Sequence, residues 1–362
     1  MTNLRPFTEA ARYHVVGLTE TGPFNTATLI STGTQYTATF GRLTTGSAPL
    51  YNDVGLYFAE GGQEVHVTRV PDMNPATVKA ALSATGEDTR GAAVAVPGGT
   101  AAALGVTLAN HAEEYGKLAL LCGGKDTTVA QLAATAQFLK GRPGSETTAI
   151  FWPWVTRGRT IQAPTGYVAA VRARAHLAHG YWKHPDGPDS RARTVTGLRT
   201  PNTPARNEEL SEQLISPLVT TRDGSVHLHG WWSLSGDRAN FPYLDTTDML
   251  NNLAADLGRA YESVTRHAWD TVPKLRSQVA AITKGRLASL ANAGAFNKRI
   301  DPDGTQSDPG YVFTVTEPEA QPPDRNVIIV RVAVRPYTHA NLISVRVFQV
   351  PILDPFPAEV TL

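Results

Sequence analysis

The sequence predicts two kinds of architecture in one 362-residue chain, an α/β region followed by an α+β region. From Asn74 to Trp152, segments of strand and helix character alternate, which is typical of parallel strands joined by helical crossovers. Two long amphipathic helices and two alternating apolar segments occupy the last third of the chain. We therefore expect an α/β domain with a short parallel sheet, an α+β domain with two amphipathic helices and β segments, and extended arms at both ends.

The first 70 residues are expected to form short strands. Runs of β-branched and aromatic residues alternate there with glycine and threonine turns. The predicted strands are Tyr13 to Leu18, Ala27 to Ser31, Thr34 to Phe40, Val54 to Phe58 and Glu64 to Val70.

The α/β region begins with a helix-start signal. Asn74 and Pro75 are an N-cap residue and a first-turn proline, and Gly86 ends the helix that they open. The elements expected next are a strand over Ala92 to Val96, a helix from Thr100 to Gly116, a strand over Leu118 to Cys122, a helix from Thr127 to Gly141 and a strand over Thr148 to Trp152.

The stretch after Trp154 is rich in arginine, glycine, proline and threonine. Its only organised segment is GYVAAVRARAHLAHGYWKHP, and residues Asp186 to Asn207 are expected to form an extended surface loop. A strand from Ser225 to Trp232 is predicted after it.

Two amphipathic helices are predicted next, and each needs a core or a partner to cover its apolar side. Asp245, with Asp248 three residues later, is expected to open the first helix as a capping pair. The apolar stripes consist of Met249, Leu250, Leu253, Leu257, Tyr261 and Val264 in the first helix, and of Val272, Leu275, Val279, Ile282 and Leu290 in the second.

The chain ends in two segments of alternating apolar residues. Ile328, Val330, Val332 and Val334 share one face of the first segment, and Ile343, Val345 and Val347 share one face of the second. The last residues, VPILDPFPAEVTL, contain three prolines and cannot form a central strand. They are expected to be a tail that lies on another surface.

Composition excludes several classes of protein. The 33 Lys and Arg residues nearly balance the 32 Asp and Glu residues, so an ordinary polyanion-binding protein is not expected. The single cysteine, Cys122, excludes an internal disulfide framework and a cysteine-ligated zinc site. Residues 1 to 7 lack the pattern of a signal peptide, and Pro97-Gly98-Gly99 interrupts the longest uncharged stretch, so a membrane span is not expected.

Two local patterns suggest an enzyme, and neither is specific. CGGKD, from Cys122 to Asp126, is similar to a phosphate loop, but Ala119 and Asp126 replace the glycine and the hydroxyl residue that such a loop requires. His227 and His229 lie two apart on a predicted strand and could share a metal ion, with His176 or His179 as a third ligand. The alternative is that these histidines belong to a half-exposed or packed strand face.

A basic segment is the clearest charge asymmetry. Between Thr271 and Ile300 there are six basic residues and no acidic residue. Lys274 and Lys284 fall outside the apolar stripe of the second amphipathic helix, whereas Arg286 falls within it. This face is either solvated or docks on an acidic partner, which would set specificity electrostatically.

The co-linear order of these segments resembles the contractile tail sheath protein family of bacteriophages and related contractile injection systems. VVGLTETGPFNTATLISTGTQYTATFG resembles the N-terminal block of that family, and YFAEGGQEVHVTRV follows as it does there. AVAVPGGT, HAEEYGKLALL and AIFWPWV are similar to its α/β core, and GYVAAVRARAHLAHGYWKHPDG to its passage between domains. The chain departs from the family at Trp231-Trp232-Ser233 and at Asp245 to Asp248, where the family has arginines.

The resemblance implies a structural subunit, not an enzyme, that needs no cofactor. It implies four parts: an N-terminal arm (1–22), an outer domain with the α/β layer (23–185), an inner domain facing the tube (186–341) and a C-terminal arm (342–362). Hexameric rings would stack around an inner tail tube and contract to drive it through a target cell envelope. The implied partners are other copies, the tube protein, and baseplate and terminator proteins, with no direct nucleic acid contact and no stable membrane insertion. The implied location is a virion or injection-system sheath, assembled in the bacterial cytoplasm.

Two sets of residues are predicted to carry this role. The tube-facing set is Lys274, Arg276, Lys284 and Arg286. The set that adds strands to neighbouring subunits is Tyr13, His14, Val15, Val16, Ile343, Val345, Val347 and Phe348. A metal-dependent hydrolase using His227 and His229, and a non-contractile structural shell or adhesin subunit, remain as alternatives.

Overall fold

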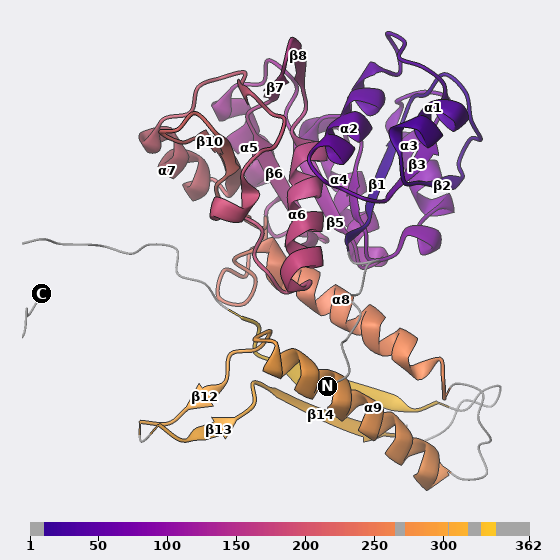
Figure 1. Ribbon diagram of the computed structural model, residues 1–362, viewed down its shortest axis with the longest axis vertical. Helices are drawn as coiled ribbons and strands as arrows, with labels where there is room; N and C mark the ends of the chain where they lie inside the picture. Colours follow the sequence, from indigo (N-terminus) through magenta and orange to yellow (C-terminus); the bar gives the residue numbers. More distant parts are fainter. Residues whose placement is uncertain (1–10, 265–271, 303, 318–326, 338–362) are drawn as a thin grey trace, which may run out of the picture.

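The computed structural model describes residues 11–264, 272–302, 304–317 and 327–337, without the side chains of residues 204, 272 and 273. Residues 11–243 form an α/β unit, called the body below. The described residues from 244 to 337 form two helices and two antiparallel strand pairs, called the helix–hairpin unit. In Figure 1 the body lies at the top and the helix–hairpin unit below it, connected through helix α8.

An eight-stranded sheet in the order β11-β10-β6-β5-β4-β1-β3-β2 is the centre of the body. Its strands are β1 (Tyr13–Gly17), β2 (Ala27–Ile30), β3 (Val65–Arg69), β4 (Ala93–Ala95), β5 (Leu118–Cys122), β6 (Thr148–Trp152), β10 (Ile215–Thr220) and β11 (Val226–Leu228). All neighbouring pairs are parallel except the two at the edges, β2 with β3 and β11 with β10. The predicted parallel sheet is therefore confirmed.

Helices cover both faces of this sheet. They are α1 (Gly33–Phe40), α2 (Ala48–Ala59), α3 (Pro75–Ala84), α4 (Ala101–Glu114), α5 (Val129–Leu139), α6 (Thr165–His179) and α7 (Pro204–Glu212). A small sheet of β7 (Val155–Arg157), β8 (Thr160–Gln162) and β9 (Gly197–Leu198) and 3₁₀ helices at Glu87–Thr89, Ser145–Thr147 and Gly187–Ser190 complete the body. One core cluster includes side chains of α2 and α6, and the other includes side chains of α3, α4 and α5.

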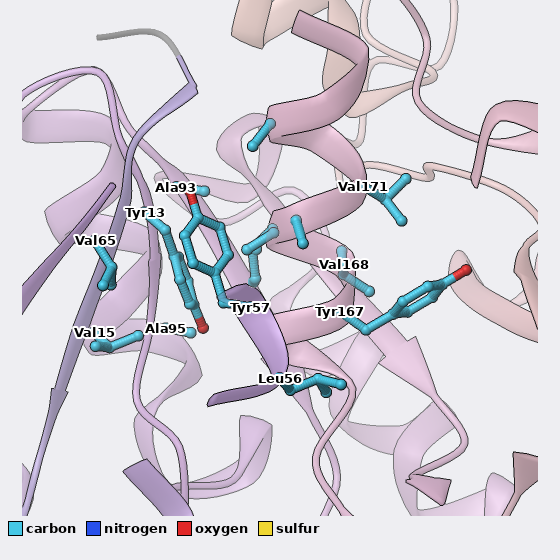
Figure 2. Packing of buried hydrophobic residues seen from close by; sticks show 14 of the residues in the cluster. Tyr13, Val15, Leu56, Tyr57, Val65, Ala93, Ala95, Tyr167, Val168 and Val171 are labelled. Atoms are coloured by element: carbon cyan, nitrogen blue, oxygen red, sulfur yellow. The ribbon is translucent and has the colours of Figure 1, made fainter. Parts of the chain in front are cut away.

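On the sheet face covered by α2 and α6, side chains of β1, α2 and α6 are in close contact. Figure 2 shows the rings of Tyr13 and Tyr57 side by side, and their centroids are 5.1 Å apart. The carboxylate of Asp53 accepts hydrogen bonds from the Tyr13 hydroxyl (2.7 Å) and the Gly166 backbone N–H (2.8 Å). Gly166 is required here because a Cβ atom would lie 2.4 Å from the Asp53 carbonyl oxygen.

Two predicted strands are helices instead. Thr34 to Phe40 lies in α1, where the Thr32 side chain accepts a hydrogen bond from the Gln35 N–H and caps the helix. Val54 to Phe58 lies in α2, whose buried residues Leu50, Val54 and Tyr57 recur at helical spacing. The β-branched and aromatic composition of both segments was outweighed by capping and by this 3.6-residue period.

The position of β1 corrects the predicted N-terminal arm. Tyr13, His14, Val15 and Val16 were expected to add to the sheet of a neighbouring subunit. They instead lie in a buried strand that pairs with β3 on one side and β4 on the other within the same chain. Both edges of β1 are therefore occupied, and the arm cannot extend to residue 22 as predicted.

The predicted boundary at residue 185 is also corrected. Strand β10 extends the central sheet beside β6, and β11 pairs with β10, so the body continues past the expected boundary. The stretch from Asp186 to Asn207, expected as an extended loop, contains a 3₁₀ helix, β9 and the start of α7. Of the predicted strand Ser225 to Trp232, Val226–Leu228 is β-structure and Trp232 forms an isolated bridge.

The helix–hairpin unit contains the two predicted amphipathic helices. Its elements are α8 (Leu244–Tyr261), α9 (Val272–Asn292), β12 (Arg299–Ile300), β13 (Gln306–Asp308), β14 (Tyr311–Thr316) and β15 (Ile329–Val334). Leu253, Leu257 and Leu290 share a buried cluster with one face of the β14–β15 hairpin. Ile343, Val345, Val347 and Phe348 lie outside the described residues. No described helix is long and apolar enough to cross a bilayer.

A cluster of buried bases lies in the body, around β1 and the start of β5. The Lys117 ammonium contacts the Thr89 hydroxyl and lies 2.9 Å from His111 Nε2, and His14 Nδ1 lies 3.3 Å from the same hydroxyl. Burial lowers the pKa of Lys117 to about 7, of His66 to about 4 and of His111 to about 3. Among the described residues, no carboxylate bonds to any of these bases.

Candidate assembly interface

The β14–β15 hairpin has two open edges. Within the described part of the chain, its strands pair only with each other. One face of the hairpin packs on α8 and α9, while Val312 on the opposite face is 63% exposed. Open edges present unpaired backbone N–H and C=O groups that a further strand can bond.

Hydrogen bonding defines which residues of β15 point their N–H groups outward. The Arg335 N–H donates to the Gly310 carbonyl (2.8 Å), across to the β14 side. Because the direction alternates along an antiparallel strand, the N–H groups of Val330, Val332 and Val334 point away from β14. The side chains of these three valines are half-buried and pack toward the two helices.

The four predicted tube-facing residues divide into two pairs. Lys274 and Lys284 are exposed on α9, ten residues and therefore about 15 Å apart along the helix. Between them the exposed positions include Ser277 and Ala281, which have small side chains. The exposed side of α9 that contains Lys274, Ser277, Ala281 and Lys284, called the outward stripe below, thus has a basic side chain at each end and small side chains between them.

The two arginines are engaged within the chain. Arg276 lies 3.9 Å from a Glu317 carboxylate oxygen, and half-buried Arg286 lies 3.8 Å from Asp256 on α8. Burial raises the pKa of Asp256 above its ordinary value, and Arg286 opposes that rise. Arg286 therefore connects α9 to α8, whereas Lys274 and Lys284 remain exposed.

A buried ion pair joins the helix–hairpin unit to the body. Arg172 of α6 donates from Nε and Nη2 to the two carboxylate oxygens of Asp248 on α8, at 2.7 and 2.6 Å. His176 Nε2 lies 3.1 Å from the same carboxylate, and Asn252 donates to it at 2.7 Å. Burial raises the pKa of Asp248, but the charges of Arg172 and His176 outweigh burial and lower it.

A second group strengthens this joint. The ring of buried His184 lies 3.0 Å from Asp245 at the start of α8 and 3.1 Å from Asp186. Burial disfavours the charged ring, but the two carboxylates raise the pKa of His184 to about 9. Asp245 and Asp248 were expected to cap the helix; the N-cap residue is Tyr243, and both carboxylates bind bases of the body instead.

The histidines of the hydrolase alternative are dispersed. His227 bonds the Gly187 carbonyl (3.1 Å) and Ser225 (2.8 Å), while His229 lies beyond β11 and is exposed. His176 faces Asp248, and His179 lies 3.8 Å from Asp189. No group of three or more His, Cys, Asp or Glu side chains that could hold a metal ion occurs in the described ranges. The metal-dependent hydrolase is therefore unsupported.

No family model and no curated protein matches this sequence. Solved structures do match its fold over most of the chain. A chain of the anti-feeding prophage (AFP) baseplate, six-fold symmetrised, has a TM-score of 0.71 at 16% identity, covering 94% of this chain and 93% of that one. The sheath complex of an extracellular contractile injection system, PVC, in its contracted state gives 0.66 at 17%, covering 94% and 92%.

The sheath tail protein of Desulfitobacterium hafniense gives a TM-score of 0.60 at 11% identity, covering 90% of this chain and 96% of that one. The fold of the chain is therefore that of contractile sheath proteins, and it covers nearly the full length of each neighbour. The predicted resemblance is confirmed at the level of the fold.

Proposed function

We propose that this chain is a structural subunit of a contractile sheath. The observation that carries the proposal is the likeness to sheath chains over 90–94% of this chain, which includes both the body and the helix–hairpin unit. In this role the chain polymerises with copies of itself as stacked hexameric rings around an inner tube. Head-to-tail contacts that do not close on themselves generate such a helical stack.

The open hairpin is the proposed connection between subunits. Extended segments from neighbouring copies would add to the edges of β14 and β15, with main-chain hydrogen bonds supplying affinity. The segment containing Ile343, Val345, Val347 and Phe348 is the proposed C-terminal donor. The proposed N-terminal donor is limited to residues before β1, since β1 is paired on both sides.

The proposed tube contact is the outward stripe of α9, through Lys274 and Lys284. Carboxylates on the tube would hold the sheath in its extended form. Contraction would then be a one-way rearrangement between two subunit lattices, with the driving free energy stored in subunit packing and no nucleotide consumed. Baseplate and terminator proteins would bind the two ends of the stack.

Negative-stain electron microscopy of the purified full chain at high concentration tests the proposal. Hollow cylinders with a regular helical striation are the expected result. Particles that remain monomeric at every concentration would contradict a self-assembling sheath. Rings or sheets with one fixed spacing, unchanged by the inner tube, would instead indicate a non-contractile shell.

A further inference from the structure

The CGGKD loop, which does not match a phosphate-binding loop in sequence, borders a cavity of about 330 Å³ in the body. The loop follows β5, and the cavity lies where β5 and β6 end. Its other walls come from Trp152 and Trp154, from Arg199 beyond β9, and from Arg206 of α7. The cavity therefore lies at the carboxyl edge of the parallel part of the sheet.

The charge of the cavity wall is strongly one-sided. Lys125, Arg199 and Arg206 line it together with one acidic residue, Asp126, so three positive charges and one negative charge leave an excess of two positive charges. All other lining residues are uncharged. The three cations come from three separate segments of the chain, which the fold brings to one cavity.

Internal contacts fix the two arginines and leave the lysine available. Arg199 bonds the Asp126 carboxylate and donates from Nε to the Lys125 carbonyl (3.1 Å). Arg206 donates to the Pro201 carbonyl (3.2 Å), and its guanidinium lies 5.8 Å from the centre of the Trp152 ring. The exposed Lys125 ammonium has no hydrogen-bond or ion-pair partner among the described residues.

We propose that this cavity binds a small oxyanion of the phosphate class. Phosphate oxygens accept hydrogen bonds from guanidinium and ammonium groups, which are the donors that line the cavity. Asp126, in the position where a nucleotide-hydrolysing loop has a hydroxyl residue, neutralises Arg199 and weakens the site. The site therefore serves binding, and no phosphoryl transfer is assigned to it.

Isothermal titration of the full chain with inorganic phosphate and pyrophosphate tests the site. We expect one anion per chain, and at least tenfold weaker binding in Lys125→Met and in Arg206→Met. Lys140→Met is the matched control, because Lys140 is exposed at the opposite end of α5 and outside the cavity. Asp126→Asn removes the one negative charge and is expected to tighten binding.

Two results would overturn the proposal: no saturable binding by the unaltered chain, or equal weakening in Lys125→Met and Lys140→Met. ADP distinguishes the source of the phosphate. Tighter binding of ADP than of pyrophosphate supports a nucleotide phosphate, and equal or weaker binding supports a free ion. The melting temperature of each variant shows whether it is folded. Tighter binding by Asp126→Asn would also support the site, because a gain in affinity cannot result from loss of folding.

Discussion

The body and the helix–hairpin unit differ in how their polar groups are satisfied. In the body, β1 is hydrogen-bonded on both sides, and even the bases around Lys117 are buried, although no carboxylate of the described residues bonds to them. In the helix–hairpin unit, no described strand pairs with the outer edges of β14 and β15, and Lys274 and Lys284 of α9 are exposed. The body thus satisfies its strands internally, whereas the helix–hairpin unit is the part through which we propose that other chains bind. Changes in the body should alter stability, and changes in the unit should alter assembly.

The largest expected effect is at the joint between the two units. Arg172→Met leaves the buried Asp248 carboxylate without its bidentate partner. We expect the free energy of unfolding to fall by about 3–5 kcal/mol, because an uncompensated buried charge is costly. Urea denaturation measures it, with Arg222→Met on the body surface as the control. A loss within about 0.5 kcal/mol, as in the control, would show that the joint contributes nothing.

The pH dependence of the joint comes next in size. The pKa of His184 rises on folding to about 9, so its contribution to stability is fully present below pH 6.5 and is lost as the pH rises through about 9. This contribution is about 3 kcal/mol. Urea denaturation from pH 6 to 10 should show a gap between wild type and His184→Gln that narrows with pH. A gap that is constant over this range would contradict the charged joint.

The buried bases predict a gain in stability. The pKa of Lys117 is lowered on folding to about 7, so the unfolded state binds more protons between pH 7 and 10.5, and stability rises with pH over that window. Lys117→Met removes the free-energy cost of burying the ammonium group. This variant also loses the hydrogen bond to Thr89, so we expect a net gain of about 2 kcal/mol in the free energy of unfolding at pH 7. Thermal melts of this variant and of Lys140→Met measure it. Destabilisation of Lys117→Met would show that its hydrogen bonds outweigh its desolvation.

A substitution at the hairpin edge should leave stability nearly unchanged and prevent assembly. Val332→Pro removes an N–H group that points away from β14, and proline is tolerated at such edge positions. We expect a melting temperature close to that of the wild type and no cylinders in electron microscopy. Val332→Leu keeps the N–H group and should still assemble. Cylinders formed by Val332→Pro would exclude strand addition at this edge of β15.

The smallest expected effect on stability is on the surface of α9. Lys274→Glu combined with Lys284→Glu changes two exposed residues, so stability should change by less than about 0.5 kcal/mol. Co-sedimentation with the inner tube should nevertheless be lost through like-charge repulsion. Lys79→Glu, exposed on α3 of the body, is the control. Equal co-sedimentation of the double variant and the control would remove the proposed tube contact.

The sequence correctly predicted those elements in which the pattern of apolar residues matches the face that is buried in the fold. The parallel strands β4, β5 and β6 and the helices α8 and α9 follow from apolar runs and helical periodicity. The signals failed in α1 and α2, where strand-forming residues carry a helical period. The strand β1 was predicted correctly, but its central place in the sheet was not, because its partners lie about 50 and 80 residues later. Residue types alone do not show which strand will become central.

The joint was missed for a different reason. Asp245 and Asp248 match a helix-capping pattern, and only the tertiary structure brings them to His184 and Arg172. The available signal was Arg172 itself, a charged residue within the apolar stretch of α6. A charge within a buried helix predicts a buried partner, although not which one. Likewise, the sequence of α9 does not show that Arg286 pairs within the chain, because its partner, Asp256, lies on the adjacent helix.

The central place of β1 also has a consequence for synthesis on the ribosome. The strand is translated before its partners β3 and β4, which emerge only after Arg69 and Ala95 have been added. During that interval the apolar residues Val15 and Val16 belong to a nascent strand with two unpaired edges. Such non-local pairing slows folding and exposes a strand to the wrong neighbours. For a protein proposed to polymerise through strand addition, early chaperone protection of this segment would keep folding ahead of assembly.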